Sequence, residues 1–167
     1  MYLLRMEGRN MITRIIYTEI WQDDFFVGLN PDEKLLFIYY LTNESVNIIH
    51  LYKCGVNRVK ADTGIDTPII QKAQRKFEEN GKMFFKNGYI FLRNAHRFER
   101  YEGSKNEIAK GKLLSRLSKE LLDWYSKLSD TPIDTLYKSE IINHKSETLK
   151  HKPIETKEGD VSNDIPF

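Results

Sequence analysis

Residues 55–82 read GVNRVKADTGIDTPIIQKAQRKFEENGK, and this stretch decides the fold. Its first part predicts a short helix that ends at Thr63–Gly64, because glycine readily adopts the left-handed conformation that stops a helix. We expect Asp66 or Thr67 to cap a second helix, along which apolar side chains recur at helical spacing until Asn80–Gly81 ends it. Two helices joined by a tight glycine turn predict a helix-turn-helix.

The residues that follow predict a β-hairpin. Residues 82–93, KMFFKNGYIFLR, contain two runs of β-forming residues joined by Asn87–Gly88, which is the strongest short-range hairpin signal. Upstream, residues 30–43 predict a capped and mostly buried helix, and residues 47–54 predict a short strand or an extended link. A helix-turn-helix followed by a hairpin predicts an α+β fold, with a winged-helix DNA-binding domain over residues 1–100.

The rest of the chain divides into two segments of different composition. We expect residues 101–129 to form one long amphipathic helix, whose apolar face would dock on the domain or pair with a second copy in a homodimer. Residues 130–167 are polar and rich in Lys, Ser and Thr, so we expect a flexible linker and a C-terminal interaction tip. The apolar face of the helix consists of Ile108, Leu113, Leu114, Leu117, Leu121, Tyr125 and Leu128.

The composition argues against catalysis, metal binding and membrane insertion. The chain has 167 residues, of which 40% are hydrophobic, and this suits one main core. Its single cysteine, Cys54, forms no internal disulfide and gives no zinc pattern with the four histidines. There is no phosphate-binding glycine loop, nucleophile elbow or HExxH motif, and no apolar run approaches the roughly 18 residues of a membrane span. We therefore expect a cytoplasmic protein that is not an enzyme and has no cofactor.

Charge is distributed unevenly along the chain. Residues 53–97 carry ten basic and four acidic side chains, a net charge of +6, and residues 98–152 carry +2. Residues 1–52 and residues 153–167 each have a net charge of −3. A positive middle and a negative end are typical of a polyanion binder with its own acidic tail. We hypothesise that this tail folds back on residues 53–97 and competes with DNA.

The second helix and the hairpin carry the candidate DNA contacts. On the helix, Lys and Arg would neutralise phosphates while glutamines reach base edges, and the basic residues of the hairpin would touch the neighbouring backbone. Roughly five to eight phosphate contacts would make the affinity fall steeply with salt. For a single helix, an ordinary solvated face is the alternative. The candidate residues are Gln71, Lys72, Gln74, Arg75, Lys76, Lys82, Lys86 and Arg93.

The aromatic residues of the hairpin have two interpretations. By strand alternation, half of them belong to the core, and the other half would be exposed for base stacking. We favour burial on both faces of the sheet, with the long helix covering the second face. These residues are Phe84, Phe85, Tyr89 and Phe91.

Several spaced motifs carry a resemblance: EIWQDDFFVGLNPDEKLLFIYYLTNESVN, then IIHLYKC, TGI and KFEENGKMFFKNGYIFLRN. Over residues 12–97 the chain resembles the N-terminal winged-helix domain of replisome-organiser and DnaD-like replication proteins from phages of Gram-positive bacteria. Where that family commonly has a glycine, this sequence has His50, and the family's second, all-helical domain has no counterpart here. The resemblance implies DNA replication in a bacterial host cell, with DNA and replication proteins as partners.

The chain ends in NDIPF, which resembles the C-terminal tip of bacterial single-stranded-DNA-binding proteins. That resemblance implies recruitment of host or phage replication and recombination enzymes. The side chains suit such docking, because two of them are apolar, a proline limits the entropy lost on binding, and a carboxylate meets a basic partner residue. Acidic residues are sparser here than in that family, since Ser162 and Asn163 stand where aspartates are usual. The expected partner-binding residues are Asp164, Ile165, Pro166 and Phe167.

Together these features favour a phage-type replication protein that binds DNA without catalysis. We prefer a single-stranded-DNA-binding role, because the tip belongs to proteins that coat single strands. A replisome organiser that binds duplex origin DNA is the first alternative, since a helix-turn-helix suits a duplex. A transcriptional regulator with the same fold is the second, and it would need no tip.

Overall fold

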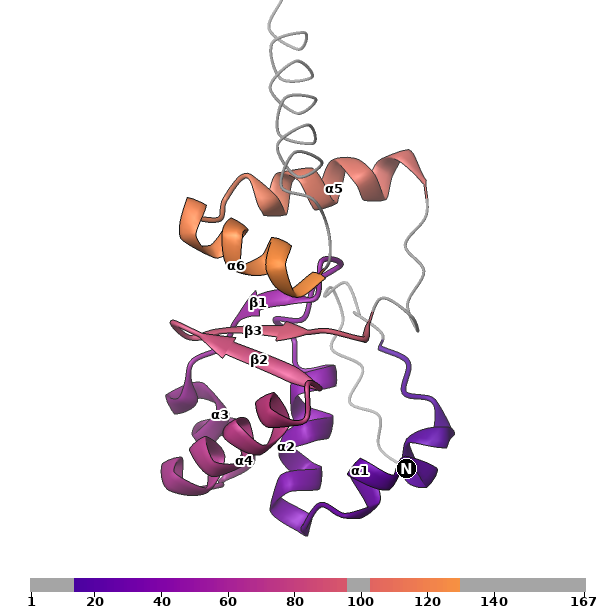
Figure 1. Ribbon diagram of the computed structural model, residues 1–167, viewed down its shortest axis with the longest axis vertical. Coiled ribbons are helices and arrows are strands. Elements are labelled where there is room, and N and C mark those ends of the chain that lie inside the picture. Colours follow the sequence, from indigo (N-terminus) through magenta and orange to yellow (C-terminus); the bar gives the residue numbers. More distant parts are fainter. Residues whose placement is uncertain (1–13, 96–102, 130–167) are drawn as a thin grey trace, which may run out of the picture.

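The computed structural model describes residues 14–95 and 103–129 as an α+β fold, which is the expected class (Figure 1). None of the helices in these two ranges is long and apolar enough to cross a membrane. The helical elements are η1 (Thr18–Gln22, a 3₁₀ helix), α1 (Asp24–Val27), α2 (Pro31–Thr42), α3 (Val56–Thr63), α4 (Thr67–Glu79), α5 (Ser104–Leu114) and α6 (Lys119–Ser129). The strands are β1 (Leu51–Lys53), β2 (Met83–Lys86) and β3 (Tyr89–Leu92).

Helix α2 begins with a complete capping box. The side chain of Asn30 accepts a hydrogen bond from the Glu33 amide at 2.9 Å, and Glu33 Oε2 accepts one from the Asn30 amide at 3.0 Å. Pro31 occupies the first helical position, where its missing N–H has no cost. These contacts satisfy amide groups that a helix start otherwise leaves unpaired, so α2 begins where the sequence predicts.

Left-handed residues set the turns on either side of α4. Gly64 has φ 74° and ends α3, while Gly81 has φ 62° and follows α4. In the hairpin, Asn87 and Gly88 have φ 51° and 76°, which is the pair of left-handed conformations that a tight two-residue hairpin turn requires. The glycine turn between two helices and the hairpin after them are therefore confirmed.

His50 also lies in the left-handed region, with φ 54°, immediately before β1. This conformation is unfavourable for most residues but costs glycine little. His50 nevertheless has only 5% of its surface exposed, and its carbonyl accepts a hydrogen bond from the Leu92 amide.

The three strands form one antiparallel sheet in the order β1-β3-β2. In the register, Phe91 of β3 lies between Leu51 of β1 and Phe84 of β2, and the adjacent row places Ile90 between Tyr52 and Phe85. Because side chains alternate along a strand, these two rows point to opposite faces. Each face therefore presents its own set of apolar side chains.

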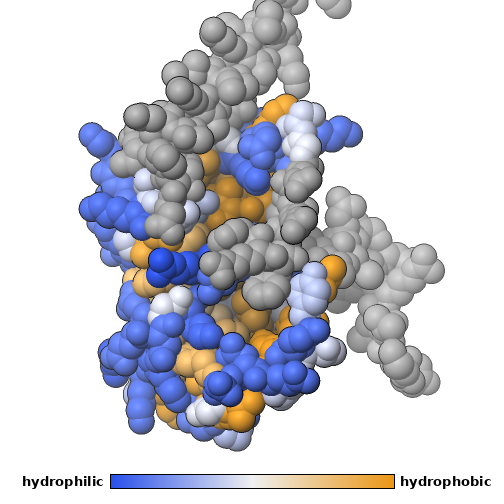
Figure 2. Space-filling view, turned by 45° about the vertical axis from the view of Figure 1, so that its right-hand side comes forward, coloured by the Kyte–Doolittle hydropathy of each residue, from blue (hydrophilic) through white to orange (hydrophobic). Residues whose placement is uncertain are grey.

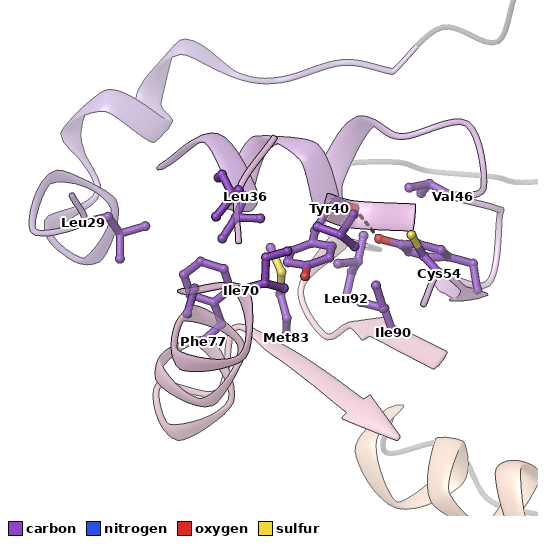
Figure 3. Packing of buried hydrophobic residues seen from close by; sticks show 14 of the residues in the cluster. Leu29, Leu36, Tyr40, Val46, Cys54, Ile70, Phe77, Met83, Ile90 and Leu92 are labelled. Atoms are coloured by element: carbon purple, nitrogen blue, oxygen red, sulfur yellow. Dashed lines mark hydrogen bonds between the residues drawn. The ribbon is translucent and has the colours of Figure 1, made fainter. Parts of the chain in front are cut away.

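Helices cover both faces of the sheet (Figure 1). Helices α2, α3 and α4 pack on one face, where the largest fully buried side chains are Tyr40, Phe26, Phe77 and Leu36. Figure 3 shows Tyr40, Phe77 and Leu36 in this cluster. The Tyr52 hydroxyl donates a hydrogen bond to the Tyr40 carbonyl at 2.6 Å and so ties β1 to α2. On the other face, α5 and α6 form a second cluster centred on Ile49, Leu51, Phe91, Leu114 and Leu122.

The single long helix predicted for residues 101–129 is wrong. Helix α5 ends at Leu114, and Ser118 caps a separate helix, because its carbonyl accepts a bond from the Leu122 amide at 2.9 Å and its hydroxyl accepts one from Leu121. The break turns the chain, so that the apolar side chains of both helices reach the same sheet face. Residues 101, 102 and 130–167 lie outside the described residues.

Candidate nucleic-acid interface

Helix α4 divides cleanly into a buried side and an exposed side. Ile70, Ala73 and Phe77 are at most 1% exposed and face the core. On the opposite side, Gln71, Lys72 and Arg75 are exposed. This spacing of apolar residues explains the orientation, because positions three and four apart share a face of a helix.

Gln74, a predicted base reader, points back into the protein. Its Nε2 donates a hydrogen bond to the Tyr40 hydroxyl at 2.9 Å. Burial raises the pKa of the Tyr40 hydroxyl, and the bond from Gln74 opposes part of that increase. The Gln74 amide therefore belongs to the contact between α4 and α2.

Lys76 is also held by α2. Its Nζ lies 2.7 Å from Glu33 Oε2, and the Glu33 side chain is only 8% exposed. Burial alone raises the pKa of Glu33, but the bonds from Lys76 and from the Asn30 amide outweigh burial and lower the pKa below its usual value. The pair therefore fixes α4 against the start of α2 and leaves Lys76 with a carboxylate partner.

The predicted hairpin contacts Lys82 and Lys86 are paired with carboxylates. Lys82 lies 3.2 Å from Asp23 and 5.0 Å from the centre of the Phe25 ring. Lys86 lies 2.8 Å from Glu120, which belongs to α6. The third contact, Arg93, is exposed, with its guanidinium 5.9 Å from the centre of the Phe84 ring, so all three cations lie against other parts of the protein.

Other basic residues of the positive segment are paired as well. Arg58 contacts Asp62 at 2.6 Å and Glu44 at 3.0 Å, and Lys60 contacts Asp66 at 2.8 Å. Within the described residues, Lys72 and Arg75 form no ion pair. The surface around α4 is thus less positive than the net charge of residues 53–97 indicates, and its unpaired positive charge is concentrated on two neighbouring turns.

The aromatic residues of the hairpin are not available as a stacking surface. Phe85 packs on the core cluster beneath α2 and α4, with its ring centre 5.4 Å from that of Tyr40. Phe84, Tyr89 and Phe91 join the cluster beneath α5 and α6, where the Phe91 and Tyr125 rings meet edge-on at 5.3 Å. Burial on both faces of the sheet, which we favoured from the sequence, is confirmed.

The predicted tip residues, Asp164, Ile165, Pro166 and Phe167, lie outside the described residues. The acidic tail that we expected to fold back on residues 53–97 also lies outside them.

Sequence reasoning missed the carboxylates that hold the predicted DNA-contacting lysines. Lys76 and Glu33 are 43 residues apart along the chain, and Lys82 and Asp23 are 59 residues apart. No local pattern signals such pairs, since they form only when the fold brings distant elements together. The excess of acids among residues 1–52 was the one available hint.

Sequence reasoning also missed a groove of about 330 Å³ between residues 15–20 and the sheet. Its lining is mostly apolar, with Glu19, Asp23, His50, Lys82 and Asn94 as polar members. None of the described residues that line the groove belongs to α4. The groove is thus a different surface from the exposed face of α4.

Comparison with protein-family models, with curated proteins and with solved structures found no match to this chain. Within the parts of the chain that the structure describes, no cluster of three or more His, Cys, Asp or Glu side chains is placed to hold a metal ion.

Proposed function

We propose that this chain is a non-catalytic DNA-binding protein of the winged helix-turn-helix type, and that it binds duplex DNA through the outer face of α4. The observation that carries the proposal is the unpaired group formed by Gln71, Lys72 and Arg75. These side chains are exposed on one helix, and within the described residues neither cation forms an ion pair, although the charge of Lys72 helps to lower the pKa of Glu33. Such a face can neutralise phosphates and reach base edges in a major groove.

The order of elements supports the same proposal. Helix α2, strand β1, helices α3 and α4, and the hairpin β2–β3 follow one another as in a winged helix, and the strand order is β1-β3-β2. In a helix-turn-helix, the second helix enters the major groove while the first crosses the backbone. Here α4 is that second helix, and it is the element with the unpaired polar face.

We further propose DNA replication as the process, with duplex origin DNA as the binding site. This part rests on the resemblance of residues 12–97 to replisome-organiser and DnaD-like proteins. The tip residues 164–167 would then recruit host or phage replication and recombination enzymes. Duplex binding and recruitment are separable activities, because the face of α4 and the tip share no residue.

Coating of single-stranded DNA is the second candidate, and the NDIPF tip favours it. Proteins that coat single strands usually stack bases on exposed aromatic side chains. The rings of Phe84, Tyr89 and Phe91 pack against α5 and α6, so the hairpin would offer a single strand phosphate contacts but no stacking surface. This packing is the reason that we place duplex binding first.

A competition experiment tests the order of the candidates. The full chain is mixed with a labelled random-sequence duplex, and unlabelled duplex or oligothymidine is added as competitor. We expect duplex to compete at least tenfold better, and Lys72→Ala together with Arg75→Ala to abolish most binding. Stronger competition by oligothymidine would favour coating, and failure of the double variant to weaken binding would remove α4 as the interface.

The tip is tested separately with Phe167→Ala. In a replication protein, this change is expected to spare DNA binding and to abolish capture of replication enzymes from the host lysate. A transcriptional regulator would bind one duplex site and work equally well with the altered tip, so unchanged activity in such an assay would favour that alternative.

A further inference from the structure

We infer that Gln71 and Arg75 are the residues of α4 that read base pairs, and that the N-terminal half of α4 lies deepest in the DNA groove. This inference rests on the proposed function, because it assigns roles within the same face of the helix. It narrows a set of five polar or basic α4 side chains to two base readers and one phosphate contact.

Two of the five side chains, Gln74 and Lys76, are held by the protein itself. The Gln74 amide donates to the Tyr40 hydroxyl at 2.9 Å, and Lys76 lies 2.7 Å from the buried carboxylate of Glu33. Turning either side chain toward DNA would leave a polar group of α2 without its partner in a largely buried place, which is costly. Gln74 and Lys76 therefore position α4 and do not read DNA.

The three remaining side chains differ in the DNA groups that they can bind. Gln71 can form two hydrogen bonds with an adenine edge, and Arg75 can form two with guanine O6 and N7. Lys72 carries a compact point charge, which suits a phosphate better than a two-bond base contact. Lys72 would therefore add affinity for any sequence, whereas Gln71 and Arg75 would add preference.

The spacing of Gln71 and Arg75 along α4 fits neighbouring base pairs. They are four residues apart and so lie on the same side of α4, about 6 Å apart along the helix axis. Successive base pairs are about 3.4 Å apart. Gln71 and Arg75 would consequently read an A·T pair and a G·C pair that are one or two steps apart.

The charge at the two ends of α4 sets the direction of entry. Glu78 and Glu79 are both exposed in the last turn, where they would repel a phosphate backbone. At the other end, Asp66 is neutralised by Lys60 at 2.8 Å, and the start of a helix is itself favourable for anions. The N-terminal half of α4, which carries Gln71, is therefore the half that approaches DNA most closely, and Arg75 follows one turn later.

Selection of binding sites from a randomised duplex pool tests this inference. The full chain is compared with Gln71→Ala, Arg75→Lys and Lys72→Ala, and the preferred site is then measured with each single base-pair change. We expect Arg75→Lys to lose about tenfold of preference at a G·C pair and Gln71→Ala to lose a similar factor at an A·T pair. Lys72→Ala is expected to weaken binding to all sequences by about the same factor.

Gln22→Ala is the matched control, because it removes an equal, exposed amide from η1, outside the proposed contact. We expect its base preference to equal that of the unaltered chain. A preference that survives in both Gln71→Ala and Arg75→Lys, or that changes in Gln22→Ala, would overturn the inference. The proposed function would stand in that case, since it fails only if the unaltered chain does not bind duplex DNA through α4.

Discussion

The carboxylate of Glu33 accepts a hydrogen bond from the Asn30 amide at the start of α2 and also forms an ion pair with Lys76. We expect Glu33→Gln to lower the free energy of unfolding at pH 7 by about 1–2 kcal/mol, because a charge-assisted hydrogen bond becomes a neutral one. The folded-state pKa of Glu33 is below its usual value, so its contribution is present above the unfolded pKa and is lost as pH falls through the folded pKa. Urea unfolding between pH 7 and pH 3 measures this.

In that experiment, the difference between the unaltered chain and Glu33→Gln should shrink toward acid pH. Glu78→Gln provides the control, since Glu78 is an exposed carboxylate of α4 and its loss should change stability by no more than about 0.5 kcal/mol. A difference for Glu33→Gln that is constant across the pH range would contradict the assigned role of the ion pair.

His50 offers a test of backbone strain that separates it from side-chain loss. Both His50→Ala and His50→Gly remove the imidazole, but only glycine accepts φ 54° without strain. We expect the glycine variant to be more stable than the alanine variant by about 1 kcal/mol in chemical unfolding. At Lys53, an exposed strand residue, the same pair of substitutions should favour alanine. Equal stabilities at His50 would mean that the backbone relaxes.

At the scale of elements, helix α6 contacts the hairpin through an ion pair as well as packing on the core. Glu120 of α6 lies 2.8 Å from Lys86, so it competes with any phosphate for that lysine. We expect Glu120→Gln to raise affinity for duplex DNA about two- to fivefold while leaving stability nearly unchanged, because an exposed ion pair contributes little. Fluorescence anisotropy at low salt measures the gain. Glu107→Gln, whose partner Lys110 lies on α5, should show none.

The packing of α5 and α6 on the sheet is tested through Leu122, which is 4% exposed. We expect Leu122→Ala to lower the free energy of unfolding by about 2–4 kcal/mol, since it leaves a cavity against Phe91 and Leu114. Ile108→Ala, at a position that is 43% exposed on α5, should cost much less. Equal effects would show that α6 does not belong to the same cooperative unit as the sheet.

Features that depend on a few adjacent residues were predictable from the sequence. The cap at Asn30, the turn at Gly64 and the hairpin turn at Asn87–Gly88 each depend on a few adjacent residues. The break between α5 and α6 was missed because residues 115–118 contain neither proline nor glycine. At the end of α5 the Ser115 hydroxyl donates a hydrogen bond to the Lys112 carbonyl, and serine also forms such bonds inside helices, so this serine does not signal a helix end. Two of the eight candidate residues, Gln74 and Lys76, changed role for a similar reason, since they take their partners from α2.

At the scale of the whole molecule, the ion pairs reduce the charge available to DNA. With Lys72 and one to three neighbouring cations as phosphate contacts, we expect roughly two to four phosphates to be neutralised, where the sequence alone indicated five to eight. The plot of log affinity against log salt should then have a slope of about −2 to −4. Binding to random duplex between 50 and 200 mM salt measures it, and a slope steeper than about −5 would require the lysine–carboxylate pairs to open.

Apolar side chains also reach the surface of the molecule. Figure 2 shows apolar surface among hydrophilic residues at the lower end, where α1 and the start of α2 lie in Figure 1. Trp21, Val27 and Leu35 are 64%, 55% and 47% exposed in η1, α1 and α2. These elements lie outside α4, so this surface does not form part of the proposed DNA contact.

Because helices cover both faces of the sheet, a stable fragment of the protein needs α5 and α6. A fragment that stopped after the hairpin would leave Leu51, Ile49 and Phe91 facing water, although they are at most 5% exposed here. A small sheet with one exposed apolar face tends to self-associate. A fragment made to study the proposed DNA contact should therefore extend through Ser129, and we expect it to be soluble and to give native spectra.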